Sequence, residues 1–413
     1  MLNKLKPAFF LMLTWLLIMT GLPYSSFADD LHYKNMIVGD RPASMGGAYV
    51  AVSDTPEGTF YNPSGLVYSV GSNLSVSVNA YHNTWKKYDN VSGIGDYTRK
   101  SSSIVPNFFG VVQPLGIGKI AFSYAVPDII EEDQNQSFTL LSNPGKFVIN
   151  RSSIDKTYKI GPSYAVKLSD SFSLGATLYF HYREEKLNLN QYLLFFSNNA
   201  YESQSEVSRK TEYGVNPKIG LMWSPLDKVS FGLTVSKVDV FKSNFSKQVI
   251  NRTNITNSSI TDNPEPVFAY SKNKRKHPIS VSAGVAYFPS EDLLFSCDID
   301  YFEAVPDENK RAVANISIGT EYYLSDRYAL RGGLYSDMAN SQPLKRGYTD
   351  QADYVNIFGI TGGITRFTRT TSMTFGFNYA SGEGEAQPVG GVTDIYKTDT
   401  RALTLFFSGS YGY

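Results

Sequence analysis

The sequence predicts an all-β protein, a transmembrane antiparallel β-barrel of about 14 strands, and three observations support this fold class. The chain ends in an alternating pattern from Leu403 to Tyr413, in which every second side chain except Gly409 is apolar or aromatic. The same period-2 pattern recurs upstream, as expected of strands that face lipid on one side and a lumen on the other. Aromatic residues make up 14% of the chain, and glycine, which occurs 33 times, fills many small positions in the alternating runs.

Residues 1–28 have the features of a secretory signal peptide. Lys4 and Lys6 precede an apolar run over 8–22, and Ser26-Phe27-Ala28 provides a small-x-Ala cleavage site. We therefore expect cleavage before Asp29, with an uncleaved anchor helix as the alternative. A cleaved signal peptide is not part of the folded protein, so the fold prediction concerns the residues that follow it.

The alternating segments are each near the length of about ten residues that a tilted membrane strand needs. In the segment 171–182, Leu174, Leu178 and Phe180 share one face, whereas Ser173 and Tyr179 lie on the other. The predicted strands are 73–82, 102–113, 117–127, 155–168, 171–182, 213–223, 228–238, 279–288, 293–301, 312–323, 327–336, 353–366, 372–380 and 402–413.

The connections between these segments alternate between short and long. The tight turns are at 114–116, 169–170, 224–227, 289–292, 324–326 and 368–369. The long polar connections are at 83–101, 128–154, 188–212, 239–278, 304–311, 337–352 and 381–401. Short turns at one rim and long loops at the other are typical of an outer-membrane barrel with periplasmic turns. We therefore expect residues 73–413 to form the barrel and the protein to reside in the bacterial outer membrane.

Composition disfavours several other classes of protein. Lys+Arg and Asp+Glu are both 38, so nothing indicates nucleic acid or another polyanion as a partner. The single cysteine, Cys297, cannot form an internal disulfide, and four scattered histidines give little basis for a metal site. No spacing around His181 marks a catalytic dyad or triad. We expect no enzymatic activity, no catalytic residues, no metal and no cofactor.

Residues 29–72 do not follow the strand register, although their apolar side chains must pack somewhere, most simply inside the barrel. This segment contains RPASMGGAYVAVSD at 41–54 and TFYNPSGL at 59–66. The two stretches resemble the start of the outer-membrane transporter family for long-chain fatty acids and other hydrophobic compounds (FadL/TodX-like). Members of that family read much like M-G-G-A-x-V-A and Y-N-P-A-G-L, and Ser64 takes the place of the alanine here.

The resemblance implies a barrel of 14 strands with an N-terminal hatch, residues 29–72, inside the lumen. It also implies passive, ligand-gated uptake of hydrophobic compounds, with long-chain fatty acids as the default substrate. The residues themselves agree in part, because Gly46 and Gly47 allow close backbone approach, and Asn62, Pro63 and Gly65 form a rigid turn. These five residues are candidates for gating, or they only fold the hatch.

Charged side chains on the inward faces carry further information, because Arg or Lys facing lipid at mid-bilayer costs about 2–4 kcal/mol. Alternation places inside Lys159, Arg183, Lys218, Arg331, Asp298, Asp300 and Glu321. One interpretation is a neutralised ladder that braces the barrel. The other is that basic groups receive the carboxylate of an amphipathic ligand while aromatic side chains line its tail. The candidate ligand-binding residues are Arg183, Lys159, Arg331, Tyr179, Phe288, Tyr335 and Phe406.

Two functions remain open from the sequence. The first is a transporter whose partner is a hydrophobic small molecule or fatty acid. The second is a non-transporting barrel with a sealed lumen, acting as a surface scaffold or adhesin through long loops such as 239–278. Either barrel would contact outer-membrane lipid and the barrel-assembly machinery, and we expect a monomer. Pro106 and Pro127 lack an N–H donor and would interrupt early strands, where a lateral exit could open.

Overall fold

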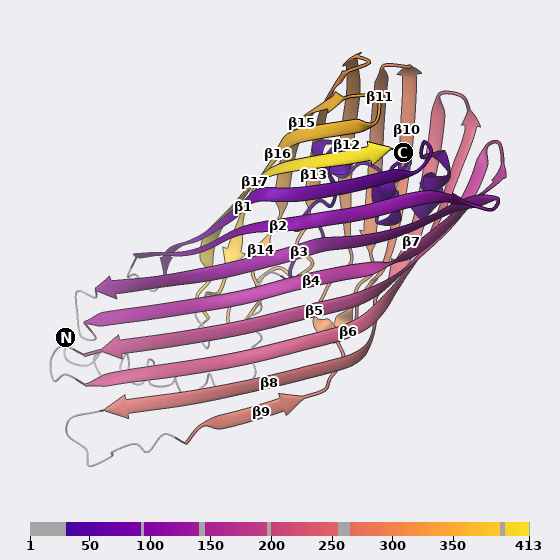
Figure 1. Cartoon of the computed structure of the whole chain (residues 1–413). Coiled ribbons are helices and arrows are strands. Elements are labelled where there is room, and N and C mark those ends of the chain that lie inside the picture. Colours follow the sequence, from indigo (N-terminus) through magenta and orange to yellow (C-terminus); the bar gives the residue numbers. More distant parts are fainter. Residues whose placement is uncertain are drawn as a thin grey trace.

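The computed structural model describes residues 30–91, 95–139, 145–195, 200–254, 265–388 and 393–412. The expected signal peptide, residues 1–28, lies outside the described residues. The described part of the chain forms a closed antiparallel β-barrel, which is elongated and cut obliquely at one end (Figure 1). The predicted fold class is confirmed.

The strands follow one another around the wall in sequence order. Their bounds are β1 Asn73–Val91, β2 Gly95–Leu115, β3 Gly118–Thr139, β4 Lys146–Ser169, β5 Phe172–Leu194, β6 Tyr201–Leu226, β7 Val229–Lys237, β8 Asp239–Asn254, β9 Val267–Ser271, β10 Ile279–Ser290, β11 Leu293–Phe302, β12 Val313–Ser325, β13 Tyr328–Asp337, β14 Tyr354–Val355, β15 Ile357–Phe367, β16 Thr371–Ala386 and β17 Tyr396–Gly412. Three of these boundaries, β7/β8, β9/β10 and β14/β15, divide one pass of the chain through the wall. All 14 predicted strands are therefore present among the described residues.

Closure comes from the pairing of β1 with β17, which begins with Asn73 opposite Gly412. The side chains alternate as predicted. On β5, Ser173 and Tyr179 are fully buried on the inner face, whereas Leu178 is 53% exposed on the outer face. A period of two residues thus separates a polar interior from an apolar exterior on this strand.

The outer face carries a row of aromatic rings that follows neighbouring strands. Tyr124, Tyr158, Tyr182 and Tyr213 lie 5.1–6.2 Å apart between successive ring centroids, on β3 to β6. Near the short turns, Trp223 on β6 stacks on a ring of β7. Aromatic girdles mark the two water interfaces of a membrane barrel, and Tyr213 and Trp223 are ten positions apart on one strand, as a bilayer crossing requires. No helix in the described part of the chain has the length and apolar character to span a bilayer.

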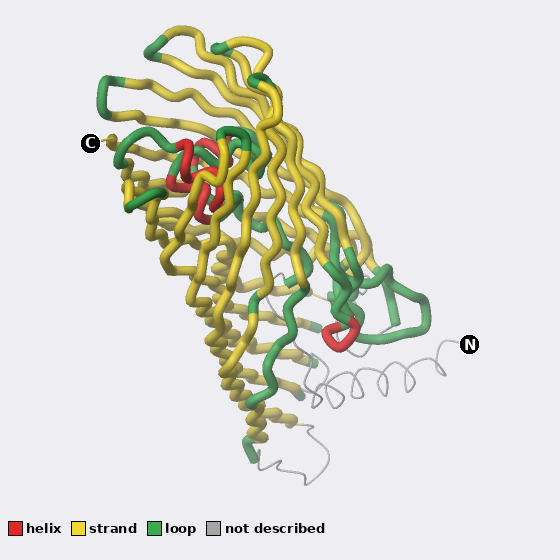
Figure 2. Tube along the Cα trace, turned by 90° about the vertical axis from the view of Figure 1, so that its right-hand side faces the viewer, coloured by secondary structure: helices red, strands yellow, loops and turns green. Residues whose placement is uncertain are grey.

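Several of the long connections predicted from the sequence are wrong, because strands continue through them. β6 has 26 residues and β4 has 24, more than twice what a bilayer crossing needs. The predicted loops 83–101, 128–154, 188–212 and 239–278 are largely occupied by the extended ends of β1 to β6 and by β8 and β9. These strands carry the wall on one side of the barrel far beyond the ends of β10 to β13 (Figures 1 and 2).

Helical turns are short and few in the described residues. They are α2 Asp40–Ser44, η2 Pro56–Thr59, η3 Pro63–Tyr68 and η4 Pro306–Glu308. The first three belong to the segment 30–72, which lies within the barrel near the end with the short turns (Figure 2). Pro56 and Pro63 begin their turns at the position where a missing N–H leaves no helical hydrogen bond unmade.

Candidate functional site

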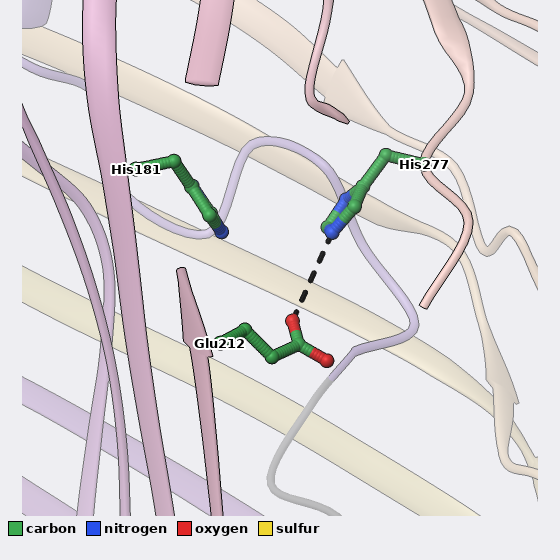
Figure 3. A group of neighbouring side chains, drawn as sticks. All are labelled: His181, Glu212 and His277. Carbon is green, nitrogen blue, oxygen red and sulfur yellow. Dashed lines mark ion pairs between the residues drawn. The ribbon is translucent and has the colours of Figure 1, made fainter. Parts of the chain in front are cut away.

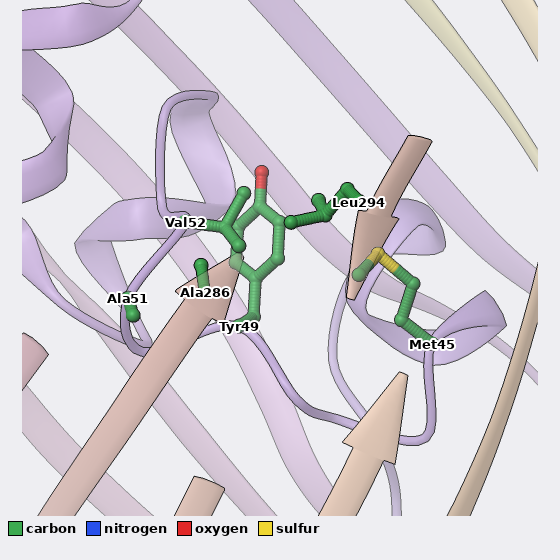
Figure 4. Close-up of a cluster of buried hydrophobic side chains, with 6 residues drawn as sticks. All are labelled: Met45, Tyr49, Ala51, Val52, Ala286 and Leu294. Atoms are coloured by element: carbon green, nitrogen blue, oxygen red, sulfur yellow. The ribbon is translucent and has the colours of Figure 1, made fainter. Parts of the chain in front are cut away.

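The N-terminal segment, residues 30–72, packs against inward-facing side chains of the wall. One buried cluster joins Met45, Tyr49 and Val52 of the segment to Leu294 of β11 and Ala286 of β10 (Figure 4). The cluster is anchored by Asp298 of β11, whose Oδ2 accepts hydrogen bonds from the backbone N–H groups of Tyr49 at 2.6 Å and Val50 at 2.8 Å. Burial and charge-assisted hydrogen bonds therefore fix this part of the segment to the wall.

Glycines of the wall allow the N-terminal segment to approach the strands within van der Waals contact. A Cβ at Gly333 would collide with the backbone of Met45 and Gly46, and one at Gly220 would collide with Oδ1 of Asn62. The wall glycines at which a Cβ would meet the N-terminal segment within 3.0 Å are Gly110, Gly175, Gly220, Gly232, Gly284, Gly319, Gly333 and Gly363. They come from eight strands, so the wall contacts the N-terminal segment around the whole barrel.

Gly220→Ala should loosen the N-terminal segment without preventing barrel formation. The new Cβ overlaps Asn62 and Pro63, and overpacking of this kind costs about 1–3 kcal/mol. The measurement is limited proteolysis of the folded protein in detergent, with faster cleavage within residues 30–72 expected. Gly332→Ala is the matched control, because its Cβ would have no neighbour closer than 3.9 Å. Equal cleavage rates in the two variants would contradict a close fit at Gly220.

The five candidate gating residues occupy special positions in this segment. Gly46 has φ +66° and Gly47 has φ +82°, and a Cβ at Gly46 would lie 2.9 Å from the carbonyl oxygen of Leu334. The side chain of Asn62 caps η3 by accepting from the N–H of Ser64, and its Nδ2 donates to the carbonyl oxygens of Val50 and Leu221. This geometry explains why these residues fold the segment.

Pro63 and Gly65 complete the turn after Asn62. Pro63 is the first residue of η3, and it lies against Gly175 of β5. A Cβ at Gly65 would lie 2.5 Å from the carbonyl oxygen of Ser53, so only glycine fits there. A gating role for the five residues stays a prediction.

Arg331 belongs to a compact ion-pair cluster between the wall and the segment. Glu321 of β12 is 1% exposed and accepts from Nε of Arg331 at 2.7 Å and from Nη2 of Arg41 at 2.6 Å. Arg41 also pairs with Asp54 at 2.5 Å. Both guanidinium groups are thus held by carboxylates of the protein, and the cluster connects α2 to β12 and β13.

Arg183 belongs to a second cluster, on the far side of the segment. It pairs with Asp155 through Nε at 2.9 Å and Nη2 at 2.6 Å, and with Asp30 at 3.2 Å. Asp30 also receives Lys310 at 2.7 Å and Arg275 at 3.1 Å. Although burial alone would raise the pKa of Asp30, the three cations hold that pKa well below its usual value. Arg183 is thus paired with carboxylates of the protein, and a role for it in ligand binding stays a prediction.

Lys159 lies in a different environment. Its Nζ donates to Oδ1 of Asn216 at 2.8 Å, and Lys218 donates to the carbonyl oxygen of Phe60. Both ammonium groups lie over the ring of Phe60, at 5.6 and 5.2 Å from its centroid. Neither forms an ion pair with a carboxylate of the described residues. Two inward-facing cations with only neutral oxygen acceptors form the arrangement in this interior that best suits an anionic group.

The four aromatic candidates do not lie together. Tyr335 and Phe406 belong to one buried cluster, with Ile37 and Ala43 of the segment. Phe288 is partly buried against the cluster around Tyr49. Tyr179 is fully buried, and its hydroxyl lies 2.8 Å from that of Ser123.

The wall is interrupted between β2 and β3. Backbone pairing there runs from Leu115 opposite Gly118 to Phe108 opposite Ala125 and resumes only at Ser101 opposite Glu132. The two stretches over which β2 and β3 do not pair with each other, 102–107 and 126–131, contain one proline each, Pro106 and Pro127. On its other side β2 remains paired with β1. The wall is therefore not fully paired at the two prolines, which cannot donate to the ladder. A lateral exit at this place stays a prediction.

Apolar side chains line this interruption. Met36 of the N-terminal segment, Val105 of β2, and Val126 and Ile129 of β3 form one buried cluster, with exposed fractions of 0–8%. The interruption begins next to Tyr124, which belongs to the outer aromatic row. This apolar cluster thus connects the barrel interior to the interruption between β2 and β3, which we call the seam. The seam lies at the level of a membrane interface.

Sequence reasoning missed several of these residues. Arg275 and His277 fall in the predicted loop 239–278, and only the fold shows that the stretch between β9 and β10 turns inward. Met36 lies outside the motifs of the N-terminal segment. An arginine and a histidine within one otherwise solvated connection were the only signal that could have pointed to this stretch.

Comparison with known proteins bears on the fold. No protein-family model and no curated protein matches the sequence. Among solved structures, the toluene transporter TodX of Pseudomonas putida has a TM-score of 0.68 and 13% identity, covering 92% of this chain and 100% of its own.

Two further solved structures cover as much of the chain. A FadL homologue of Pseudomonas aeruginosa has a TM-score of 0.65 and 12% identity, covering 92% of this chain and 99% of its own. The toluene transporter TbuX of Ralstonia pickettii has a TM-score of 0.61 and 12% identity, with the same coverage. At these identities the likeness is one of fold, and it extends over nearly the whole of each chain.

Proposed function

We propose that this chain, which has the fold of the FadL- and TodX-type channels, takes up hydrophobic compounds across the bacterial outer membrane. The observation that carries this proposal is the interruption between β2 and β3, lined by Met36, Val105, Val126 and Ile129. A molecule leaving the interior there meets apolar side chains and then lipid, so it never needs to cross water. Residues 29–72 act as the hatch, and the barrel works as a monomer.

Long-chain fatty acids are the proposed substrates, because the interior offers a cationic site beside apolar surface. Lys159 and Lys218 would receive the carboxylate, which neutralises two charges that no described carboxylate pairs with. Binding would also draw Lys218 away from the carbonyl oxygen of Phe60. That hydrogen bond joins the wall to the hatch, so the ligand itself would loosen the hatch.

A neutral hydrocarbon would use the apolar path without the lysines. In the double variant Lys159→Met/Lys218→Met, palmitate should bind about 10- to 100-fold more weakly, because a hydrogen bond to a charged group contributes about 1.5–3 kcal/mol. Toluene should bind as it does to the unaltered protein. The measurement is ligand-induced thermal stabilisation in detergent, with Lys397→Met, an exposed lysine on β17, as the control. Unchanged palmitate affinity would remove both lysines from the site.

The route is tested on the unaltered protein. A fatty acid with a diazirine in its chain, irradiated when bound, should label peptides that contain Met36, Val105 or Ile129. Native mass spectrometry of the detergent-extracted protein should show retained long-chain lipid. Labelling confined to peptides away from β2 and β3 would overturn the lateral route, even if the ligand binds.

The alternative function is a surface scaffold or adhesin, and one observation favours it. The extended ends of β2 to β6 and β8 present a tall one-sided wall beyond the membrane. A protein that retains no lipid and gains no thermal stability from fatty acids or toluene would support this alternative over transport.

A further inference from the structure

Two histidines and a glutamate from separate parts of the chain meet inside the barrel, at the level of the outer aromatic row. His181 comes from β5, Glu212 from β6, and His277 from the inward-turning stretch between β9 and β10 (Figure 3). One possible ligand atom from each lies within 4.8 Å of the other two. The imidazole rings are 5.5 Å apart between centroids, and Nε2 of His277 lies 3.9 Å from a carboxylate oxygen of Glu212.

His181 and Glu212 are buried, His277 is partly buried, and all three have unused hydrogen-bonding capacity. His181 is only 2% exposed, and neither of its ring nitrogens has a hydrogen-bond partner. Nε2 of His277 and both carboxylate oxygens of Glu212 also lack a partner with hydrogen-bond geometry. Buried polar atoms are rarely left in this way, because each lost hydrogen bond costs about 1–3 kcal/mol. A bound ion would satisfy these atoms together.

The neighbouring charged groups leave one carboxylate oxygen of Glu212 available to bind an ion. Its Oε1 faces Nζ of Lys210 at 2.8 Å and Nε of Arg275 at 3.4 Å, close enough for ion pairing, while Oε2 faces His277. Arg275 is in turn paired with Glu185 at 2.6 Å and with Asp30. The local cations are thus offset by carboxylates, and Oε2 remains available.

The ring of His277 is the more accessible of the two imidazoles. Burial lowers its pKa, and the facing charge of Glu212 opposes that shift. The other charged groups that face this ring are Arg275 and Asp30. A partly exposed edge of His277, 17% of its side chain, gives an ion a route to the group.

We propose that His181, Glu212 and His277 bind a divalent transition-metal ion of the zinc type. Two imidazole nitrogens and one carboxylate oxygen form a donor set that zinc accepts, with a fourth position left for water. Metal–ligand distances near 2.0–2.1 Å place neighbouring ligand atoms about 3.3 Å apart, so the side chains would close inward by about 1 Å.

The ion would tie the stretch between β9 and β10 to the wall. That stretch also carries Arg275, which reaches Asp30 at the start of the N-terminal segment. Metal binding would therefore set the position of a bridge across the barrel interior. This role is independent of which hydrophobic compound the barrel carries.

The first test uses the unaltered, untagged protein, refolded after treatment with a chelator. Zinc titration against a chromophoric competitor should show one ion bound per chain. Electron paramagnetic resonance with Cu²⁺ should show coupling to two imidazole nitrogens, because Cu²⁺ fits the same ligands and binds more tightly. Absence of stoichiometric zinc binding, or a Cu²⁺ spectrum without nitrogen coupling, would overturn the proposal.

Variants then assign the ligands. His181→Gln, Glu212→Gln and His277→Gln should each weaken zinc binding at least ~100-fold, since even an indirect partner of a metal ligand is worth 10–100-fold. His82→Gln is the matched control, because His82 is also buried, at 4% exposure, but its Nδ1 bonds to Thr404. The heat-dependent shift of the folded barrel on gels reports folding of each variant. Equal affinity in His181→Gln and His82→Gln would exclude His181 as a ligand.

Discussion

Glu321→Gln should lower the free energy of unfolding by about 3–5 kcal/mol, the range expected when one partner of a buried ion pair is removed. Glu321 is almost fully buried and joins Arg331 of the wall to Arg41 of the N-terminal segment. The variant keeps the shape of the side chain but leaves the guanidinium of Arg331 without a carboxylate. The measurement is urea unfolding of the barrel in lipid vesicles.

Glu291→Gln is the matched control, because Glu291 is exposed in the turn between β10 and β11. The same change of charge should have little effect there. Unfolding midpoints that coincide for the two variants would show that the cluster around Glu321 contributes no net stability. Loss of Glu321 should also increase proteolysis of residues 30–72, since Arg41 would lose its ion pair with the wall and keep only the pair with Asp54 of its own segment.

Leu178→Arg should lower the free energy of unfolding by about 2–4 kcal/mol, the cost of a cation facing lipid at mid-bilayer. Leu178 is 53% exposed on the outer face of β5, between the turn and Tyr182. Asn188→Arg provides the control on the same face of the same strand, beyond the aromatic row, where the cost should fall to about 0–1 kcal/mol. Urea unfolding in vesicles measures both.

The reverse order of these two effects would place the membrane at the extended end of the wall. Equal effects would mean that the aromatic row does not mark an interface. The comparison therefore tests the position of the bilayer on the barrel, which the outer aromatic row and the apolar face indicate.

The membrane part of every strand could be predicted from the sequence, because lipid imposes apolar side chains at every second position. On β5 the alternation of Leu174, Leu178 and Phe180 is unambiguous. Beyond Tyr182 the outer face meets water. Polar residues such as Glu184 and Asn188 occupy the outward positions there, so apolar and polar side chains no longer alternate. The strand continues through its backbone pairing with β4 and β6, which leaves no mark in side-chain composition.

The sequence predicts which side chains of the candidate site face the barrel interior, but it does not predict which residues they contact. Parity alone places Arg183, Lys159 and Arg331 inside the barrel. It cannot show that Arg183 meets Asp155 and Asp30, or that Lys159 meets Asn216, because these partners lie on other strands or in the N-terminal segment. The meeting of His181 and His277 likewise depends on an inward turn of the chain that periodicity does not reveal.

The depth of the interruption between β2 and β3 in the membrane determines the free-energy cost of leaving its backbone groups without ladder partners. Backbone N–H and C=O groups released from a ladder in the hydrocarbon core cost several kcal/mol each, since no water can reach them. Beside Tyr124, at the edge of the hydrocarbon, lipid head groups and water can hydrogen-bond to backbone groups that the β2–β3 ladder does not use. A molecule with one polar end, passing at this height, would keep that end hydrated while its tail entered the membrane, so the barrel would release it already oriented like a lipid.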